Sequence, residues 1–182
     1  MEEVKNYFRL VRKGLRGVSR RSIANVVTVL KVVKRKRGTV FLCGNGGSGS
    51  TASHLVGDLC QLVGVRAVCL NDSMSNVSAN ANDDCWGNVF VNQLRLFLRP
   101  FDVVWVFSGS GNSLNVVNAV EFANRRGNIS IGFCGFDGGR LKKTAMFVVH
   151  VPVDHMGVCE DVHLLLGHLV CYYLEGWYAS SG

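Results

Sequence analysis

The sequence predicts an α/β fold in which a five-stranded, doubly wound parallel sheet forms the middle of three layers. From residue 38 onward, short apolar runs alternate with stretches of helical periodicity, the pattern of a chain that winds strand, helix, strand. The runs are rich in Val, Ile and Phe and lack polar alternation, which is typical of strands buried on both faces of a sheet. They cover residues 39–43, 67–70, 103–107, 129–133 and 146–151.

Helical periodicity fills the intervals between these runs, and we expect a helix in each of four segments. Pro100 and Pro152 are the two prolines, and no repeat or linker interrupts the pattern, so residues 38–182 are predicted to form one domain. Ligands of such folds bind at the carboxyl ends of the strands, where the strand order reverses. The expected helices cover residues 48–63, 87–98, 113–126 and 158–177.

Residues 1–37 are predicted to form a helical arm used for packing or oligomerisation. Apolar residues recur at three- and four-residue spacing from Val4 to Val33, which indicates a long amphipathic helix. Glycine weakens the middle of this stretch, so we expect a break near residues 17–20. A stripe of this length is well suited to packing against a second subunit.

The composition is that of a globular chain that buries additional surface in an oligomer. Of its 182 residues, 48% are hydrophobic and 18% are charged. No apolar run reaches the ~18 residues of a membrane span, and the charged start at Glu2 does not resemble a secretion signal. Seven cysteines without a Cys-x-x-Cys pair fit buried thiols in a reducing compartment. We therefore expect a cytoplasmic homo-oligomer with no membrane partner.

Positive charge is concentrated in residues 1–37. This segment holds twelve Lys or Arg residues against Glu2 and Glu3, so it carries +10, and the remaining residues carry −3 of the net +7. Such a block fits nucleic acid, a solvated helix face, or a wall that attracts an anionic substrate. Few aromatic residues lie among these cations and no nucleic-acid motif is present. We favour the last two interpretations and do not expect a nucleic-acid partner.

A loop rich in glycine and hydroxyl groups follows the first predicted strand. Residues 43–51 run Cys-Gly-Asn-Gly-Gly-Ser-Gly-Ser-Thr and lead into a helix. Glycines let the backbone approach a ligand closely, and a helix start offers unpaired N–H groups to an anion. The loop is neither a Walker A motif nor a G-x-G-x-x-G motif. Capping of the helix by Ser48 is the alternative explanation of its hydroxyl groups.

The third predicted strand ends in a second loop of the same kind. Residues 108–113 run Ser-Gly-Ser-Gly-Asn-Ser and again lead into a helix. Two such loops after two buried strands indicate a shared site for a phosphate monoester, held by neutral hydroxyl and amide groups. Helix capping by Asn112 is compatible with this function.

Metal-binding residue types lie on two of the predicted helices. His54 and Asp58 are four residues apart and therefore share a helix face. Glu160 and His168 share a face of the last helix, whereas His163 points elsewhere. Two imidazoles and two carboxylates would suit zinc if the two helices meet, within one subunit or across an interface.

In these motifs the chain resembles the phosphoheptose isomerases, which are SIS (sugar isomerase) domain proteins with a flavodoxin-like fold. The likeness extends over about residues 38–175, in order and with nearly matching spacing. It rests on the 43–48 loop with His54 and Asp58 behind it, Asn82-Asp83, the 108–113 loop with Asn115-Val116, the 135–139 turn, and 162–168.

The resemblance implies an isomerase that interconverts sedoheptulose 7-phosphate and D-glycero-D-manno-heptose 7-phosphate through an enediol. It also implies a homotetramer with one zinc ion per subunit and with sites at subunit interfaces. Asp58 would be the base and His168 the acid, and both would surround the metal together with His54 and Glu160. The substrate-binding positions would be Asn45, Gly46, Gly47, Ser48, Asp58, Asn82, Asp83, Ser108, Gly109, Ser110, Ser113 and Glu160.

Four positions depart from the pattern of this family. Asp58 stands where the family has Glu, so the carboxylate is one methylene shorter; Glu160 replaces Gln and adds a charge. Gly109 replaces Thr, and Val158 replaces Arg. A carboxylate is the better hard ligand for a metal, whereas a displacement of about 1 Å at a catalytic group costs on the order of a hundredfold in rate.

Two other functions are compatible with the same fold. Some SIS relatives bind a replication initiator protein without catalysis, and that group lacks the equivalent of His168, so His168 favours the enzyme. Sugar-phosphate sensors of this class carry a DNA-binding module, and residues 1–37 show no helix-turn-helix signature.

Overall fold

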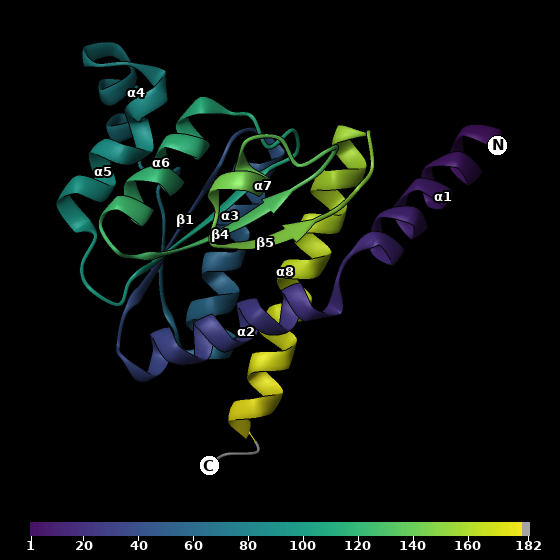
Figure 1. Cartoon of the computed structure of the whole chain (residues 1–182), viewed down its shortest axis with the longest axis horizontal. Coiled ribbons are helices and arrows are strands. Elements are labelled where there is room, and N and C mark those ends of the chain that lie inside the picture. Colours follow the sequence, from purple (N-terminus) through teal and green to yellow (C-terminus); the bar gives the residue numbers. More distant parts are fainter. Residues whose placement is uncertain (180–182) are drawn as a thin grey trace.

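The computed structural model, which describes residues 1–179, contains one five-stranded sheet (Figure 1). All strands are parallel and lie in the order β2-β1-β3-β4-β5. The chain therefore moves from β1 to one edge, returns past β1 to β3, and continues to the other edge. This is the doubly wound topology that the sequence predicts. The strands are β1 Thr39–Gly44, β2 Arg66–Cys69, β3 Val103–Ser108, β4 Ile129–Cys134 and β5 Phe147–His150.

Helices cover both faces of the sheet and enclose two apolar cores (Figure 1). One core joins α2, α3 and α8 to the sheet, and the other joins α5, α6 and α7. Because side chains alternate along a strand, Val104 enters one core and Trp105 the other. The helices are α1 Glu2–Gly17, α2 Arg20–Arg35, α3 Gly47–Asp58, α4 Met74–Asp83, α5 Val89–Phe97, α6 Leu114–Arg125, α7 Leu141–Thr144 and α8 Met156–Ala179, with single turns at Leu59–Val63 and Trp86–Asn88.

The N-terminal segment is helical, with the predicted break directly after Gly17. α2 buries Val26 in the core beneath the sheet. α1 packs on α8, extends away from the sheet (Figure 1), and leaves Val4 and Phe8 exposed. The use of residues 1–37 as a separate oligomerisation unit stays a prediction.

The predicted strands are all present, with ends within one residue of their expected positions. The expectation that every strand is buried on both faces is wrong for the two edge strands. Arg66 and Val68 of β2 are exposed, and most of β5 is half-buried. Strands of four residues are too short to show polar alternation, so the sequence does not distinguish these edges from the centre. No helix in residues 1–179 is long and apolar enough to cross a membrane.

Two helices were not predicted, and both have a physical reason. α4 has no buried residue, so its sequence has no apolar periodicity to detect. α7 is a single turn of four residues. The helix expected at 48–63 changes to a π-helical turn at Leu59–Val63 and ends at Gly64, whose φ is 67°.

A buried carboxylate joins the amino ends of β1 and β3. Asp102 is 5% exposed, and its two oxygens accept hydrogen bonds from the backbone N–H groups of Thr39 and Arg99, each at 2.7 Å. Asn128 donates to the carbonyl oxygens of Arg99 and Asp102 at 2.8 and 3.0 Å. One carboxylate and one amide therefore fix the starts of three neighbouring strands.

Replacing Asp102 with Ala is expected to lower the free energy of unfolding by about 3 kcal/mol, because buried N–H donors lose a charged acceptor. Urea denaturation followed by circular dichroism measures this change. Glu2→Ala is the control: this exposed carboxylate makes no side-chain hydrogen bond among the described residues, so its removal should change the stability by less than about 0.5 kcal/mol. Equal stability of both variants would contradict the anchoring role of Asp102.

Candidate active site and metal centre

The two predicted loops leave neighbouring strands at the same edge of the sheet. β1 and β3 are paired in parallel, with Gly44 opposite Phe107, so the loops after them start side by side. The helix after β1 covers one face of the sheet and the helix after β3 covers the other. The loops therefore diverge at the point where the strand order reverses, which is the expected ligand position in such a sheet.

The first loop is fixed by two asparagine side chains. The Asn71 amide donates to the Gly44 carbonyl oxygen at 2.8 Å and accepts from the Gly44 N–H at 3.2 Å. The amides of Asn45 and Asn115 donate to each other at 2.9 Å in both directions, which joins the first loop to α6. Asn71 was missed as a site residue because it belongs to no motif and follows β2, the edge strand.

The second loop is held in a tight turn by its own serine. Ser108 Oγ accepts a hydrogen bond from the Gly111 N–H at 3.1 Å and lies 3.5 Å from Ser113 Oγ. Gly111 has a φ of 68°, and a Cβ there would lie 2.1 Å from the Gly138 carbonyl oxygen. Only glycine fits this position, because the backbone conformation and the close approach both exclude a side chain.

The turn between β4 and α7 supports the second loop by backbone contacts. The Gly135 N–H donates to the Gly109 carbonyl oxygen, and the Leu141 N–H donates to the Gly111 carbonyl oxygen, both at 2.8 Å. The Arg140 N–H donates to Asn112 Oδ1 at 3.0 Å. The turn predicted at residues 135–139 therefore supports the second loop through hydrogen bonds.

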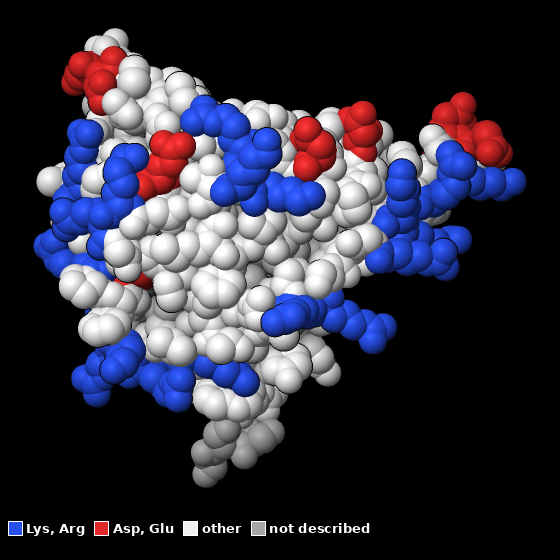
Figure 2. All heavy atoms as spheres, viewed as in Figure 1, with Lys and Arg blue, Asp and Glu red and all other residues white. Residues whose placement is uncertain are grey.

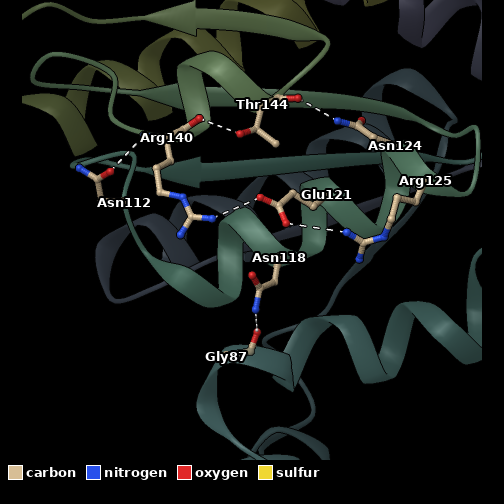
Figure 3. Close-up of polar contacts among 8 residues, drawn as sticks. All are labelled: Gly87, Asn112, Asn118, Glu121, Asn124, Arg125, Arg140 and Thr144. Atoms are coloured by element: carbon tan, nitrogen blue, oxygen red, sulfur yellow. Dashed lines mark hydrogen bonds and ion pairs between the residues drawn. The ribbon is translucent and has the colours of Figure 1, made fainter.

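Figure 3 shows how this turn is tied to α6. The Arg140 guanidinium contacts one oxygen of Glu121 at 3.3 Å, and Arg125 lies 3.8 Å from the other oxygen. On the far side of the turn, the Asn124 amide donates to the Thr144 carbonyl oxygen at 2.8 Å. These contacts, together with that of Asn112, link the loop, the turn and α6.

His54, Asp58 and His168 converge at one point on the surface. The two histidine Nε2 atoms are 2.9 Å apart, and Asp58 Oδ2 lies 3.7 Å from that of His54 and 3.5 Å from that of His168. The ligand atoms of all three lie within 4.8 Å of one another. The two helices predicted to carry metal ligands therefore do meet within one chain.

Close packing of α3 on α8 places the two histidines. Leu55 follows His54 and packs directly on Gly167, which precedes His168. A Cβ at Gly167 would lie 2.5 Å from Leu55 Cδ1, so the absence of a side chain allows this approach. The histidine side chains are each about half exposed, at 53% for His54 and 48% for His168, so the cluster is open to a ligand.

The three donors fit a tetrahedral metal such as zinc. Bonds of roughly 2.0–2.2 Å in a tetrahedron place ligand atoms about 3.4 Å apart, and the observed separations lie between 2.9 and 3.7 Å. Two imidazole nitrogens facing each other around a carboxylate oxygen are also a donor set that zinc favours. Among residues 1–179, this is the one group of three or more His, Cys, Asp or Glu residues whose side chains lie close enough to share a metal ion.

Glu160 does not lie in this cluster. Its carboxylate lies on the first loop: a Cβ built on Gly47 would be 2.5 Å from Glu160 Oε2. Eight residues of helix separate it from His168, so the shared face that the sequence predicts places the two side chains about 12 Å apart along the axis. Within one chain, the structure therefore brings together three of the four predicted ligands.

Asn82 and Asp83 lie at the end of α4, both exposed, and Asn82 Nδ2 donates to Asp83 Oδ1 at 2.8 Å. α4 packs on α5 and on the Trp86–Asn88 turn, away from the histidine cluster. Within residues 1–179, these two predicted substrate residues therefore lie apart from the cluster of His54, Asp58 and His168.

His163 lies on a different face of α8, as the sequence predicts. It is fully buried, with its ring centre 6.3 Å from that of Phe107 and 5.9 Å from that of Phe133. Burial lowers the pKa of His163 to about 4 because the charged ring would lose its hydration. His163 is therefore neutral at physiological pH and serves the core.

Known proteins share both the sequence pattern and the fold of this chain. A family model described as "SIS domain" matches residues 6–135. The phosphoheptose isomerase of Rhodospirillum rubrum is 32% identical over 159 residues, which cover 85% of each chain. That of Akkermansia muciniphila is 36% identical over 141 residues, 75% of each chain.

Solved structures of phosphoheptose isomerases have the same fold as this chain. Phosphoheptose isomerase GmhA from Neisseria gonorrhoeae superposes with a TM-score of 0.89 and 27% identity, covering 96% of both chains. A phosphoheptose isomerase from Francisella tularensis has a TM-score of 0.87 and shares the fold at 22% identity, covering 96% of this chain and 95% of its own. The chain therefore belongs to the SIS-domain proteins and, among them, to the phosphoheptose isomerases, a family of sugar-phosphate isomerases.

Proposed function

We propose that this protein interconverts sedoheptulose 7-phosphate and D-glycero-D-manno-heptose 7-phosphate through an enediol. The observation that carries the proposal is the meeting of His54, Asp58 and His168 on the helices α3 and α8. α3 begins in the first glycine-rich loop and ends at Asp58, so the proposed base and a candidate phosphate site belong to one continuous segment. The names of the relatives support this pair of substrates.

The two loops would bind the phosphate end of the substrate. Ser48 is at the start of α3 and Ser113 precedes α6, so hydroxyl and N–H donors of two helix starts lie at neighbouring strand ends. These donors are neutral, so they bind the phosphate less strongly than charged groups would, and the product can leave. We assign Ser108, Ser110 and Gly109 to the same phosphate site.

Asp58 and His168 are the proposed acid–base pair. Asp58 would take a proton from the carbon next to the carbonyl group, and His168 would give a proton to the carbonyl oxygen, which yields the enediol. Asp58 then gives its proton to the neighbouring carbon, and His168 takes a proton from the hydroxyl group on the first carbon, which forms the new carbonyl group and yields the isomeric sugar. The side chains of Asp58 and His168 are adjacent, 3.5 Å apart at Oδ2 and Nε2, so both groups can act on adjacent atoms of one substrate. When these two atoms hold a metal ion, Asp58 Oδ1 and His168 Nδ1 are the atoms left for proton transfer.

We propose that His54, Asp58 and His168 hold one zinc ion per subunit. A bound zinc ion would polarise the substrate carbonyl and stabilise negative charge on its oxygen. Glu160 of α8, whose carboxylate contacts the first loop at Gly47, is assigned to the substrate hydroxyl groups. Asn82 and Asp83 are assigned to substrate at a site completed by another subunit of a homotetramer, since both are exposed in the single chain.

Asp58→Asn is expected to lower kcat at least a hundredfold because an amide cannot accept the substrate proton. Proton NMR of sedoheptulose 7-phosphate with the zinc-loaded protein measures the reaction. Asp58→Glu is the matched control, since it keeps the carboxylate and restores the family's usual residue; it should retain measurable turnover. His168→Asn should be as inactive as Asp58→Asn. Wild-type turnover by Asp58→Asn would remove the base role from this residue.

Zinc content provides a test that does not depend on activity. Zinc-loaded protein, dialysed and analysed by atomic emission, should retain about one ion per chain, and His54→Ala should lose it. His155→Ala is the control because His155 lies outside the cluster. A chelator should abolish isomerisation and added zinc should restore it. Full zinc retention by His54→Ala would show that the three residues do not form the site.

Asn112→Ala is expected to raise KM for the sugar phosphate several-fold while changing kcat less, because the second loop loses its side-chain contact with the Arg140 N–H. Steady-state kinetics separates the two constants. Asn118→Ala is the matched control: Asn118 also lies on α6, but its amide donates to the Gly87 carbonyl oxygen, away from the loop (Figure 3). An equal rise in KM for both variants would contradict the role given to Asn112.

A further inference from the structure

The edge of the sheet opposite the candidate site carries a second concentration of positive charge. It is built from four separate segments: the residues after α2, the start of β2, the region around the end of α5, and the end of α6. Figure 2 shows Lys and Arg side chains gathered along this margin, at the left of the view, where α2, α5 and α6 end. The exposed cations of this edge are Arg35, Lys36, Arg37, Arg66, Arg95, Arg99, Arg125 and Arg126.

Within residues 1–179, acidic groups offset only part of the charge of this edge. Asp102 is buried and its two oxygens are taken by backbone N–H groups. Glu121 is shared between Arg125 and Arg140. Within residues 1–179, Arg37, Arg66 and Arg99 form no ion pair, although each is exposed.

Helix dipoles explain only part of the charge. Cations in the last turn of a helix offset the partial negative charge of its unpaired carbonyl groups. This accounts for Arg35, Arg95 and Arg125, which end α2, α5 and α6. Arg66 begins a strand, and Arg37 and Arg99 lie in loops. Three guanidinium groups are therefore in excess of what the helix ends require.

These three guanidinium groups surround one hollow of about 440 Å³. Its apolar wall includes Phe41, Val68 and Phe97. A second hollow of about 290 Å³ adjoins it, sharing Arg99 and Asp102 and adding Phe101 and Arg126. The surface thus combines planar cationic donors with apolar walls in two adjoining hollows.

Two phenylalanine rings are exposed beside these cations. Phe97 is 51% exposed and Phe101 is 60% exposed. Phe101 has a φ of 71°, a conformation that is unfavourable for a bulky residue, and the Lys36 ammonium lies 5.3 Å from the centre of its ring. An aromatic residue that leaves its ring exposed beside a cation, on a strained backbone, marks a candidate contact surface.

We infer that this edge, defined by Arg37, Arg66, Arg99, Phe97 and Phe101, binds single-stranded nucleic acid. Guanidinium groups bind backbone phosphates, and exposed rings stack on bases of any sequence. A duplex hides its base faces from such rings, and an acidic peptide would leave them unused. The site lies at the opposite end of the strands from the isomerase site and does not depend on the proposed reaction.

Fluorescence anisotropy of a labelled twelve-residue oligothymidylate tests the inference with the full chain. The variant Arg37→Ala, Arg66→Ala, Arg99→Ala should bind at least tenfold more weakly at low salt. The slope of log affinity against log salt should fall by about 2, because each single-strand phosphate contact contributes roughly 0.7. The variant Phe97→Leu, Phe101→Leu keeps the charge and should bind at least fivefold more weakly, with an unchanged salt slope.

A matched control removes the same charge elsewhere. Arg9, Arg12 and Arg16 are exposed on α1, so their triple Ala variant should bind the oligonucleotide within twofold of wild type. Unchanged circular dichroism spectra of the edge variants would show that they fold, and unchanged isomerase turnover would show that the two sites are separate. Three outcomes would overturn the inference: no binding by wild type at low salt, an equal loss in the α1 control, or equal competition by polyglutamate or duplex DNA.

Discussion

The reversal of strand order between β1 and β3 is the constraint on which the site depends. Parallel strands need crossovers of one hand, so a chain that moves in opposite directions from β1 and β3 must place α3 on one face and α6 on the other. The loops that begin these helices therefore separate and leave space at the strand ends. The Asn45–Asn115 amide pair joins the first loop to the start of α6 across that space.

The cluster of His54, Asp58 and His168 depends on a second constraint, the apolar contact between α3 and α8. His54 and His168 are 114 residues apart, and no local motif brings them together. The packing of Leu55 on Gly167 does so, because each residue is adjacent to one of the histidines and helix geometry then directs both rings to the same side. The position of the metal-binding residue types at the surface is thus set by a contact between two buried helix faces. The same core continues along the sheet through Leu59 and Val162.

Sequence reasoning recovered the elements with strong periodicity and the motifs with unusual composition. The strands, the break after Gly17 and the glycine-rich loops were predictable because each has a local signal. The position of Glu160 was not, since a shared helix face fixes an angle but not the distance along the axis or the neighbouring element. Asn71 and the helix α4 could not be predicted, because neither the residue types nor the spacing of these segments differs from that of ordinary loops. The arginines of the opposite edge come from separate segments, so only the fold reveals their proximity.

The two ends of this sheet have opposite electrostatic character for the same physical reason. At the carboxyl ends of the strands, helices begin and their N–H groups favour anions; at the amino ends, helices finish and their carbonyl groups favour cations. At the first end, the phosphate site that we propose uses neutral groups such as Ser48 and Ser113 and no lysine. The second end needs cations merely to offset the helix termini. Arg37, Arg66 and Arg99 exceed that need and form no ion pair with another residue of 1–179, and a protein gains nothing in stability from such mutual repulsion. Their position around two adjoining hollows with exposed rings fits the anionic ligand that we infer, whose bases those rings would contact.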